Sequence, residues 1–164
     1  MWKHLRFGAV CALVLGMATG RTVLGTARVG AQEPIRVDQR FGELRFARLD
    51  FDHDGRSEIG DRIAVRGPLV DPVTGDRVGL AFWDCVTMTR VVSFEPPRGS
   101  QVCTGLIRLT DGDITIHGPD PGGYGVSVFG VTGGTGLYRN ARGEADVVDA
   151  PDPDRTEITI QLEG

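Results

Sequence analysis

From residue 42 onwards, hydrophobic and polar residues alternate in short runs, and glycine, proline and aspartate separate the runs. A period of two residues is typical of β-strands with one buried face, whereas no window shows the 3.6-residue period of a helix. An Asp-Gly pair at residues 111–112 predicts a tight hairpin turn. The pattern therefore predicts an all-β fold, either an eight-stranded antiparallel β-barrel or a sandwich. The predicted strands cover residues 42–51, 62–71, 77–94, 101–109, 114–118, 126–134, 143–150 and 156–164.

The start of the chain has a different character. The basic segment MWKHLR is followed by the apolar stretch FGAVCALVLGMATG and then by small residues up to Ala31. This order is typical of a secretory signal peptide, and the apolar stretch is shorter than the about 20 residues that span a bilayer. We expect a signal peptide over residues 1–31, a barrel domain over residues 32–164, and a secreted, extracellular protein without membrane insertion. Cleavage after Ala27, or an N-terminal helix packed on the domain, are the alternatives.

The charge of residues 32–164 excludes several functions. Four of the 18 basic residues and none of the 22 acidic residues lie in residues 1–31, so the remainder has a formal charge of −8. Nucleic acids and anionic membranes prefer a basic surface, and we expect neither as a partner. The only lysine is Lys3, which excludes Schiff-base chemistry and a P-loop from the predicted domain.

Two cysteines, Cys85 and Cys103, lie in the predicted domain, on consecutive predicted strands. An even number of cysteines in an oxidising compartment favours a disulfide, and antiparallel pairing would place these two opposite each other. Two histidines, His53 and His117, are too scattered to form a structural zinc site with them. We therefore expect a cross-strand disulfide, and neither a metal nor a cofactor.

A glycine-rich segment, VFGVTGGTGLYRNARG, covers residues 128–143. A dinucleotide-binding motif would need a third glycine where Arg139 stands, and a helix after it. We interpret Gly133, Gly134 and Gly136 instead as residues that allow a positive φ at a sharp turn between two strands.

The same turn, read as VTGGTGLYRNARGEADV, closely resembles the signature of dirigent proteins and the allene oxide cyclase barrel family, in which a late glycine, here Gly143, follows the turn. Four other segments are similar to that family in the same order: SEIGDRIAVRGPLVDPVTGDRVG, FWDCVTM, CTGLIRLTDGDITIHGP and TEITIQL. The resemblance implies an eight-stranded barrel with a hydrophobic pocket that guides the stereochemistry of a reactive small molecule. It also implies homo-oligomers, since plant members are often trimers.

Two departures separate this chain from the plant enzymes. The segment LRFARLDFDHD shows no clear match to the Glu and Asn pair of the plant cyclases, and Pro119 and Asp120 follow Gly118 where dirigent proteins have an arginine. The resemblance therefore implies the barrel, but neither plant reaction.

Several side chains are candidates for a pocket. Trp83 lies two residues before Cys85 and shares its face, so it lines a pocket if the disulfide lies inside the barrel; it could equally be core. Tyr124 is expected near the barrel mouth, and Tyr138 is expected to plug the barrel. His117 ends a strand, where a surface position is an equal alternative to a pocket position.

An acidic segment from Asp50 to Asp61 imitates a calcium-binding loop. Its eighth position is Ser57, its twelfth is an aspartate instead of a bidentate glutamate, and no helices are predicted beside it. We expect weak calcium binding or none, and interpret the segment as a solvated loop.

Three functions fit these observations. The first is an enzyme without a cofactor, of cyclase or isomerase type, that steers the stereoselective cyclisation or coupling of a hydrophobic, unsaturated small molecule. The second is a lipocalin-like binding protein without chemistry. The third is a sealed structural barrel. A hydrolase is not expected, because the chain has no Gly-x-Ser-x-Gly motif.

Overall fold

The computed structural model describes residues 32–53, 58–89, 100–122, 125–150 and 155–163. Within these residues no helix has the length and apolar character needed to cross a membrane. The two helices are single 3-10 turns, η1 (Phe41–Glu43) and η2 (Gly136–Tyr138). The strands are β1 (Ile35–Arg40), β2 (Arg45–Leu49), β3 (Arg62–Val70), β4 (Arg77–Thr87), β5 (Gln101–Leu109), β6 (Gly112–Asp120), β7 (Gly125–Gly134), β8 (Gly143–Ala150) and β9 (Arg155–Leu162).

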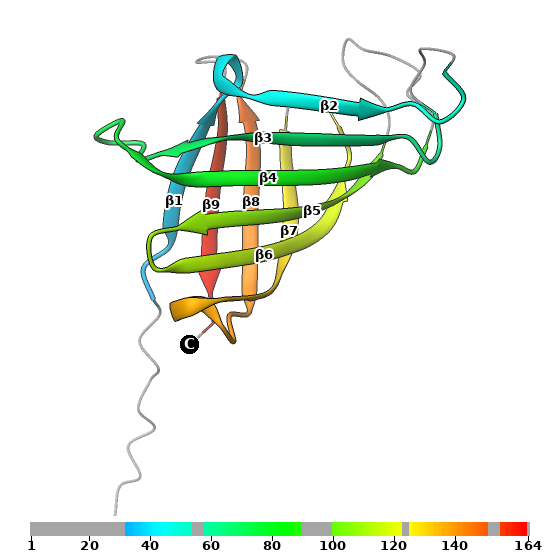
Figure 1. The fold of residues 1–164 in the computed structure, drawn as a ribbon. Helices are drawn as coiled ribbons and strands as arrows, with labels where there is room; N and C mark the ends of the chain where they lie inside the picture. Colours follow the sequence, from blue (N-terminus) through cyan, green and yellow to red (C-terminus); the bar gives the residue numbers. More distant parts are fainter. Residues whose placement is uncertain (1–31, 54–57, 90–99, 123–124, 151–154, 164) are drawn as a thin grey trace, which may run out of the picture.

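The strands form a closed antiparallel barrel (Figure 1). From β3 to β9, consecutive strands pair with one another. Strand β1 pairs with β9 on one side and with β3, at Asp38 and Val70, on the other. This last pairing closes a barrel of eight strands, β1 and β3 to β9. The predicted eight-stranded antiparallel barrel is confirmed.

The first barrel strand, however, is not the predicted one. The predicted strand at residues 42–51 overlaps β2, which pairs only with β3 and has no buried residue. Its place in the barrel is taken by β1, where Val37, Asp38 and Gln39 are buried consecutively. Because two of its three buried residues are polar, β1 does not alternate between buried hydrophobic and exposed polar residues. Their burial depends on partners far along the chain: Arg155, 3.4 Å from Asp38, and Trp83 for Gln39.

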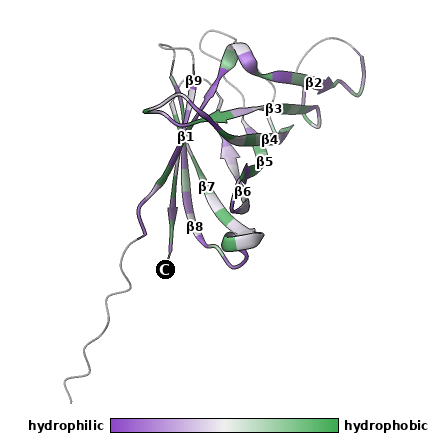
Figure 2. Ribbon diagram, turned by 60° about the vertical axis from the view of Figure 1, so that its left-hand side comes forward, coloured by the Kyte–Doolittle hydropathy of each residue, from purple (hydrophilic) through white to green (hydrophobic). Residues whose placement is uncertain are grey.

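Two other boundaries can be compared with the prediction. Strand β4 ends at Thr87, short of the predicted residue 94, and residues 90–99 lie outside the described residues. The predicted β5–β6 hairpin is present, and Leu109 pairs with Gly112 across a connection of Thr110 and Asp111. Along the strands, hydrophobic and hydrophilic residues alternate because only one face points into the barrel (Figure 2).

One end of the barrel is filled by aliphatic side chains. Leu69, Ile107, Ile114, Ala145 and Ile160 are fully buried there, from five different strands. Each buried Leu or Ile stabilises the fold by about 1.5–3 kcal/mol relative to an exposed one. Tyr138 in η2 packs against this core, as the plug prediction anticipates, and burial raises its pKa.

The glycine turn between β7 and β8 is structural. Gly133, Gly136 and Gly143 have φ values of 150°, 57° and 140°. Gly134 does not have a positive φ, which corrects our prediction for this residue. A Cβ at Gly134 would instead overlap the carbonyl oxygen of Asp113, so the close approach of two backbones requires a glycine there.

Candidate functional site

The other end of the barrel is hollow. A pocket of about 490 Å³ lies where β4, β6 and β8 end and β3, β5, β7 and β9 begin. Its volume is within the range typical of small-molecule sites. The described residues that line it are Gln39, Phe41, Leu44, Phe46, Ile63, Val65, Trp83, Cys85, Gln101, Cys103, Asp120, Ser127, Phe129, Val147, Asp149 and Thr156.

The segment between β1 and β3 covers one side of this pocket. After β1 the chain turns through η1, and Phe41, Leu44 and Phe46 all line the pocket. Leu44 packs on Gly67 so closely that a Cβ at that glycine would lie 2.5 Å from the Leu44 side chain. Strand β2 is therefore no barrel strand, but it supplies part of the pocket wall.

Trp83 lines the pocket, which is one of the two positions that the sequence left open, and its indole ring is fixed on several sides. Its Nε1 donates a hydrogen bond to Oε1 of Gln39 at 2.9 Å, and Gln39 Nε2 donates to the carbonyl oxygen of Gly67 at 3.3 Å. The ring of Phe129 lies 5.6 Å away between centroids, tilted by 54°. Gly105 on β5 leaves room for the indole, because a Cβ there would lie 2.8 Å from Trp83.

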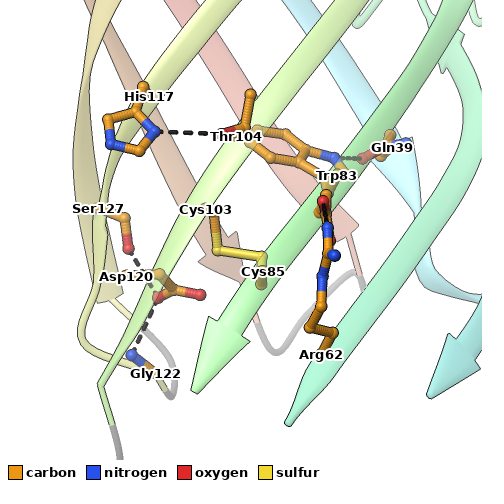
Figure 3. The surroundings of a disulfide bond; sticks show 11 residues. Gln39, Arg62, Trp83, Cys85, Cys103, Thr104, His117, Asp120, Gly122 and Ser127 are labelled. Carbon is orange, nitrogen blue, oxygen red and sulfur yellow. Dashed lines mark hydrogen bonds and ion pairs between the residues drawn. A yellow bond between two sulfur atoms is a disulfide. The ribbon is translucent and has the colours of Figure 1, made fainter. Parts of the chain in front are cut away.

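The predicted disulfide between Cys85 and Cys103 is present and faces the pocket (Figure 3). The two residues are direct cross-strand partners on β4 and β5, with Cα atoms 4.0 Å apart. Both are buried. The structure therefore confirms both the pairing and its position inside the barrel.

Two aspartates, which the sequence analysis did not select, form a polar side of the pocket. Oδ1 of Asp120 accepts hydrogen bonds from Ser127 Oγ at 3.1 Å and from the Gly122 backbone at 2.9 Å (Figure 3). Oδ1 of Asp149 accepts one from Thr156 Oγ1 at 2.7 Å. Burial raises the pKa of Asp149, the hydrogen bond from Thr156 opposes the rise, and the charge of Asp120 adds to it.

A signal for both residues is present in the sequence. Ala145 and Val147 alternate inward along β8, and the next inward position is Asp149. On β6, Ile114, Ile116 and Gly118 are likewise followed by Asp120. The alternation continues through both acidic residues. Asp120 lies beyond the predicted strand at residues 114–118, and Asp149 lies within the predicted strand at residues 143–150 but was not considered as a pocket residue.

Of the other two predicted pocket residues, the structure describes His117 alone, and His117 does not line the pocket. His117 is exposed on the outer face of β6, and its Nδ1 lies 3.1 Å from Thr104 Oγ1 (Figure 3). Its neighbours Ile116 and Gly118 are the buried, inward-facing residues, so period two directs His117 outward. Tyr124 lies outside the described residues.

The calcium-like segment is organised by its own last aspartate. The buried carboxylate of Asp61 accepts hydrogen bonds from the backbone of Glu58 at 3.0 Å and of Phe51 at 3.3 Å, and it pairs with Arg48. Residues 54–57 lie outside the described part of the chain. Within the described part, no cluster of three or more His, Cys, Asp or Glu could hold a metal. Weak or absent calcium binding stays a prediction.

No protein-family model and no curated protein matches the chain. Several solved structures do match the chain. Pyocyanin demethylase is 25% identical, with a TM-score of 0.64 over 79% of this chain and 99% of that chain. The Diels-Alderase AbmU from Streptomyces koyangensis is 17% identical, with a TM-score of 0.59 over 79% and 64% of the two chains. The pterocarpan synthase dirigent protein PsPTS1 is 15% identical, with a TM-score of 0.58 over 80% and 96%. The chain therefore has the barrel fold of dirigent proteins and of cycloaddition cyclases.

Proposed function

We propose that this protein binds a hydrophobic, unsaturated small molecule in the barrel pocket and steers its stereoselective cyclisation or coupling without a cofactor. The observation that carries the proposal is the pocket of about 490 Å³, with aromatic and aliphatic walls, at the hollow end of the barrel. The fold shared with a dirigent protein and a Diels-Alderase supports it.

The pocket is suited to holding one conformer of a flexible ligand. The indole of Trp83 donates a hydrogen bond to Gln39, packs against Phe129 and lies close to Gly105. This wall of the pocket is therefore already ordered before a ligand binds, which lowers the entropic cost of binding. Orientation of reacting groups alone can contribute about 7–11 kcal/mol to lowering a barrier. A rigid wall of this kind therefore supplies the main contribution that a cyclisation without covalent catalysis requires.

Two other functions bear on the same pocket. A lipocalin-like protein would use it for binding alone, whereas a sealed structural barrel is not favoured because one end is hollow. Demethylation of a small molecule is a second candidate reaction, favoured by the 25% identity to pyocyanin demethylase over 99% of that chain. In such a reaction the methyl carbon would leave as formaldehyde with its oxygen from water, and an oxidised aromatic ring system of the substrate would take up the two electrons.

We further propose that the protein is secreted. The disulfide between Cys85 and Cys103 supports this, since structural disulfides persist in oxidising compartments. The basic and apolar character of residues 1–31 supports it as well.

Native mass spectrometry of the protein purified from its natural source tests the function. We expect a co-purified small molecule that is released on unfolding. Incubation with the protein should then convert it or its precursor. Cyclisation leaves the molecular mass unchanged, coupling joins two molecules, demethylation removes one CH2 unit, and passive binding gives no conversion. A pocket that retains no small molecule, together with no binding of hydrophobic probes, would contradict the proposal.

The role of Trp83 is testable with the neutral hydrophobic dye Nile red. We expect Trp83→Ala to weaken Nile red binding at least about tenfold while the barrel stays folded, because the side chain forms a wall of the pocket. Phe82→Ala is the matched control, since Phe82 is an aromatic residue of the same strand on the opposite face. Equal affinity of the Trp83→Ala variant and the parent would show that the dye does not use this pocket.

A further inference from the structure

All charged residues in the described lining of the pocket are acidic. Among its described lining residues are two acidic groups, Asp120 and Asp149, and no arginine, lysine or histidine. Charged surface pairs elsewhere in the barrel are compensated, for example Arg62 with Asp84 and Arg108 with Asp113. Within the described part of the chain, the pocket therefore offers negative charge to a ligand, and none of its lining residues supplies a cation to neutralise that charge.

Both carboxyl groups are held in place and retain an available oxygen. The hydrogen bonds that they accept, from Ser127, Gly122 and Thr156, all end on Oδ1. Among the described residues, Oδ2 of each aspartate has no hydrogen-bond partner, and neither atom is both buried and unsatisfied. The second oxygen of each group is thus accessible and can accept a bond from a ligand or pair with its charge.

The aromatic residues of the same pocket also favour positive charge. Trp83, Phe129, Phe41 and Phe46 all line it, and the edge of the Trp83 indole is occupied by Gln39. A cation is attracted to the face of an aromatic ring, most strongly when it is desolvated and the ring is Trp. Aromatic rings and carboxylates therefore recognise the same kind of ligand.

A neutral ligand would leave the two carboxyl groups in an unfavourable state. Burial disfavours ionisation of Asp149, and the charge of Asp120 disfavours it further. A positively charged ligand relieves both effects. The formal charge of −8 on residues 32–164 adds a long-range attraction for cations.

We propose that the pocket selects a cationic aromatic molecule, one that carries a quaternary or protonated nitrogen beside an aromatic ring system. The ring contacts Trp83 and Phe129, and the nitrogen faces Asp120 and Asp149. This inference rests on the proposed function, because it names the class of molecule that the same pocket binds.

A series of similar two-ring molecules that differ in charge tests it. Displacement of Nile red is measured for cationic N-methylquinolinium, neutral 1-methylnaphthalene and anionic 1-naphthoate, with the parent and the D120N/D149N variant. We expect the parent to prefer the cation over the anion at least about a hundredfold, and the double variant to reduce this preference at least about tenfold. Asp146→Asn is the control, because Asp146 lies on the same strand as Asp149 at an outward position and should leave the preference unchanged.

Binding of the neutral molecule separates failure of this inference from failure of the proposed function. If the neutral molecule binds and the parent shows no preference for the cation, or if the preference persists in D120N/D149N, the charge selectivity is overturned and the hydrophobic pocket stands. If none of the three molecules displaces Nile red, both proposals fail. Unchanged affinity for the neutral molecule in the double variant shows that its pocket is intact.

Discussion

Gly105 shows how a single missing side chain shapes the pocket. It lies on β5 opposite Trp83, and a Cβ at this position would lie 2.8 Å from both the Trp83 ring and the fully buried Ile116. Ile116 has no room to move because it belongs to the core. The indole of Trp83 would have to shift into the pocket instead.

We therefore expect Gly105→Ala to destabilise the protein by about 1–3 kcal/mol, as overpacking does in a filled core, and to weaken Nile red binding. Gly130→Ala is the matched control, because Gly130 is an exposed strand glycine whose added Cβ would have the His117 carbonyl oxygen, at 3.8 Å, as its neighbour. Urea unfolding monitored by circular dichroism checks both variants. A Gly105→Ala variant as stable as Gly130→Ala would show that Trp83 is not confined.

Asp149 should make the protein less stable as the pH rises. Its pKa is raised above the ordinary value of 3.8 in the folded state, mainly by burial, so the folded state retains the proton to higher pH than the unfolded chain. Stability therefore falls as the pH increases from 3.8 through the raised pKa, and is constant above it.

Asp149→Asn removes this pH dependence while keeping an oxygen for the hydrogen bond from Thr156. We expect the melting temperature of the variant, relative to the parent, to increase between about pH 3.5 and pH 7. The substitution leaves the neighbouring polar groups of the pocket unchanged. These groups are Asp120 of β6 and the uncharged Ser127 of β7 and Thr156 of β9. Thermal unfolding at a series of pH values measures the difference. A relative melting temperature that decreases with pH would contradict the assigned shift. The Asp149→Asn variant is expected to gain stability and lose cation binding, a trade-off that is common at functional sites.

A disulfide links strands β4 and β5 and stabilises this pair of strands. Cys85 and Cys103 are 18 residues apart, and a disulfide that closes a loop of this size stabilises a protein by about 3 kcal/mol in the chain-entropy model. The double variant C85A/C103A should lose about this amount of unfolding free energy in urea.

Thiol counting on the unreduced, unfolded protein checks the same disulfide directly. We expect no reactive thiol in a chain that lacks residues 1–31, and one, from Cys11, in the full chain. Two further reactive thiols would contradict the disulfide, and a loss of stability below about 1 kcal/mol would contradict its contribution.

Strands β1 and β2 show why a strand's role was harder to predict than its existence. The alternation in β2 is genuine, but its residues are exposed because the strand pairs with β3 beyond the barrel. β1 lacks alternation and yet closes the barrel, through pairing with β9 and β3. Pairing partners, which no local pattern contains, decided which of the two became a barrel strand.

The whole molecule combines a solid end and a hollow end in one barrel. Buried aliphatic residues and Tyr138 fill the end near the β5–β6 hairpin, whereas acidic and aromatic residues surround the pocket at the other. A barrel of eight strands is just wide enough for side chains or for one small ligand, so the size of the inward residues decides between the two. The core at one end can thus stabilise the fold while the other end remains available for binding.

The sequence by itself determined the antiparallel all-β architecture and the pairing of Cys85 with Cys103, and it placed Trp83 on the same face as Cys85. All three follow from a period of two residues and from the order of the strands, because the backbone alone directs alternate side chains to opposite faces and consecutive strands pair side by side. Only the tertiary structure decided that β1 closes the strands into a barrel, that the face of Trp83 and the disulfide points inward, and that Asp120 and Asp149 meet in one pocket with Gln39. These depend on register and closure between strands distant in sequence, and the free energy that sets them comes from contacts that exist only once the barrel has formed.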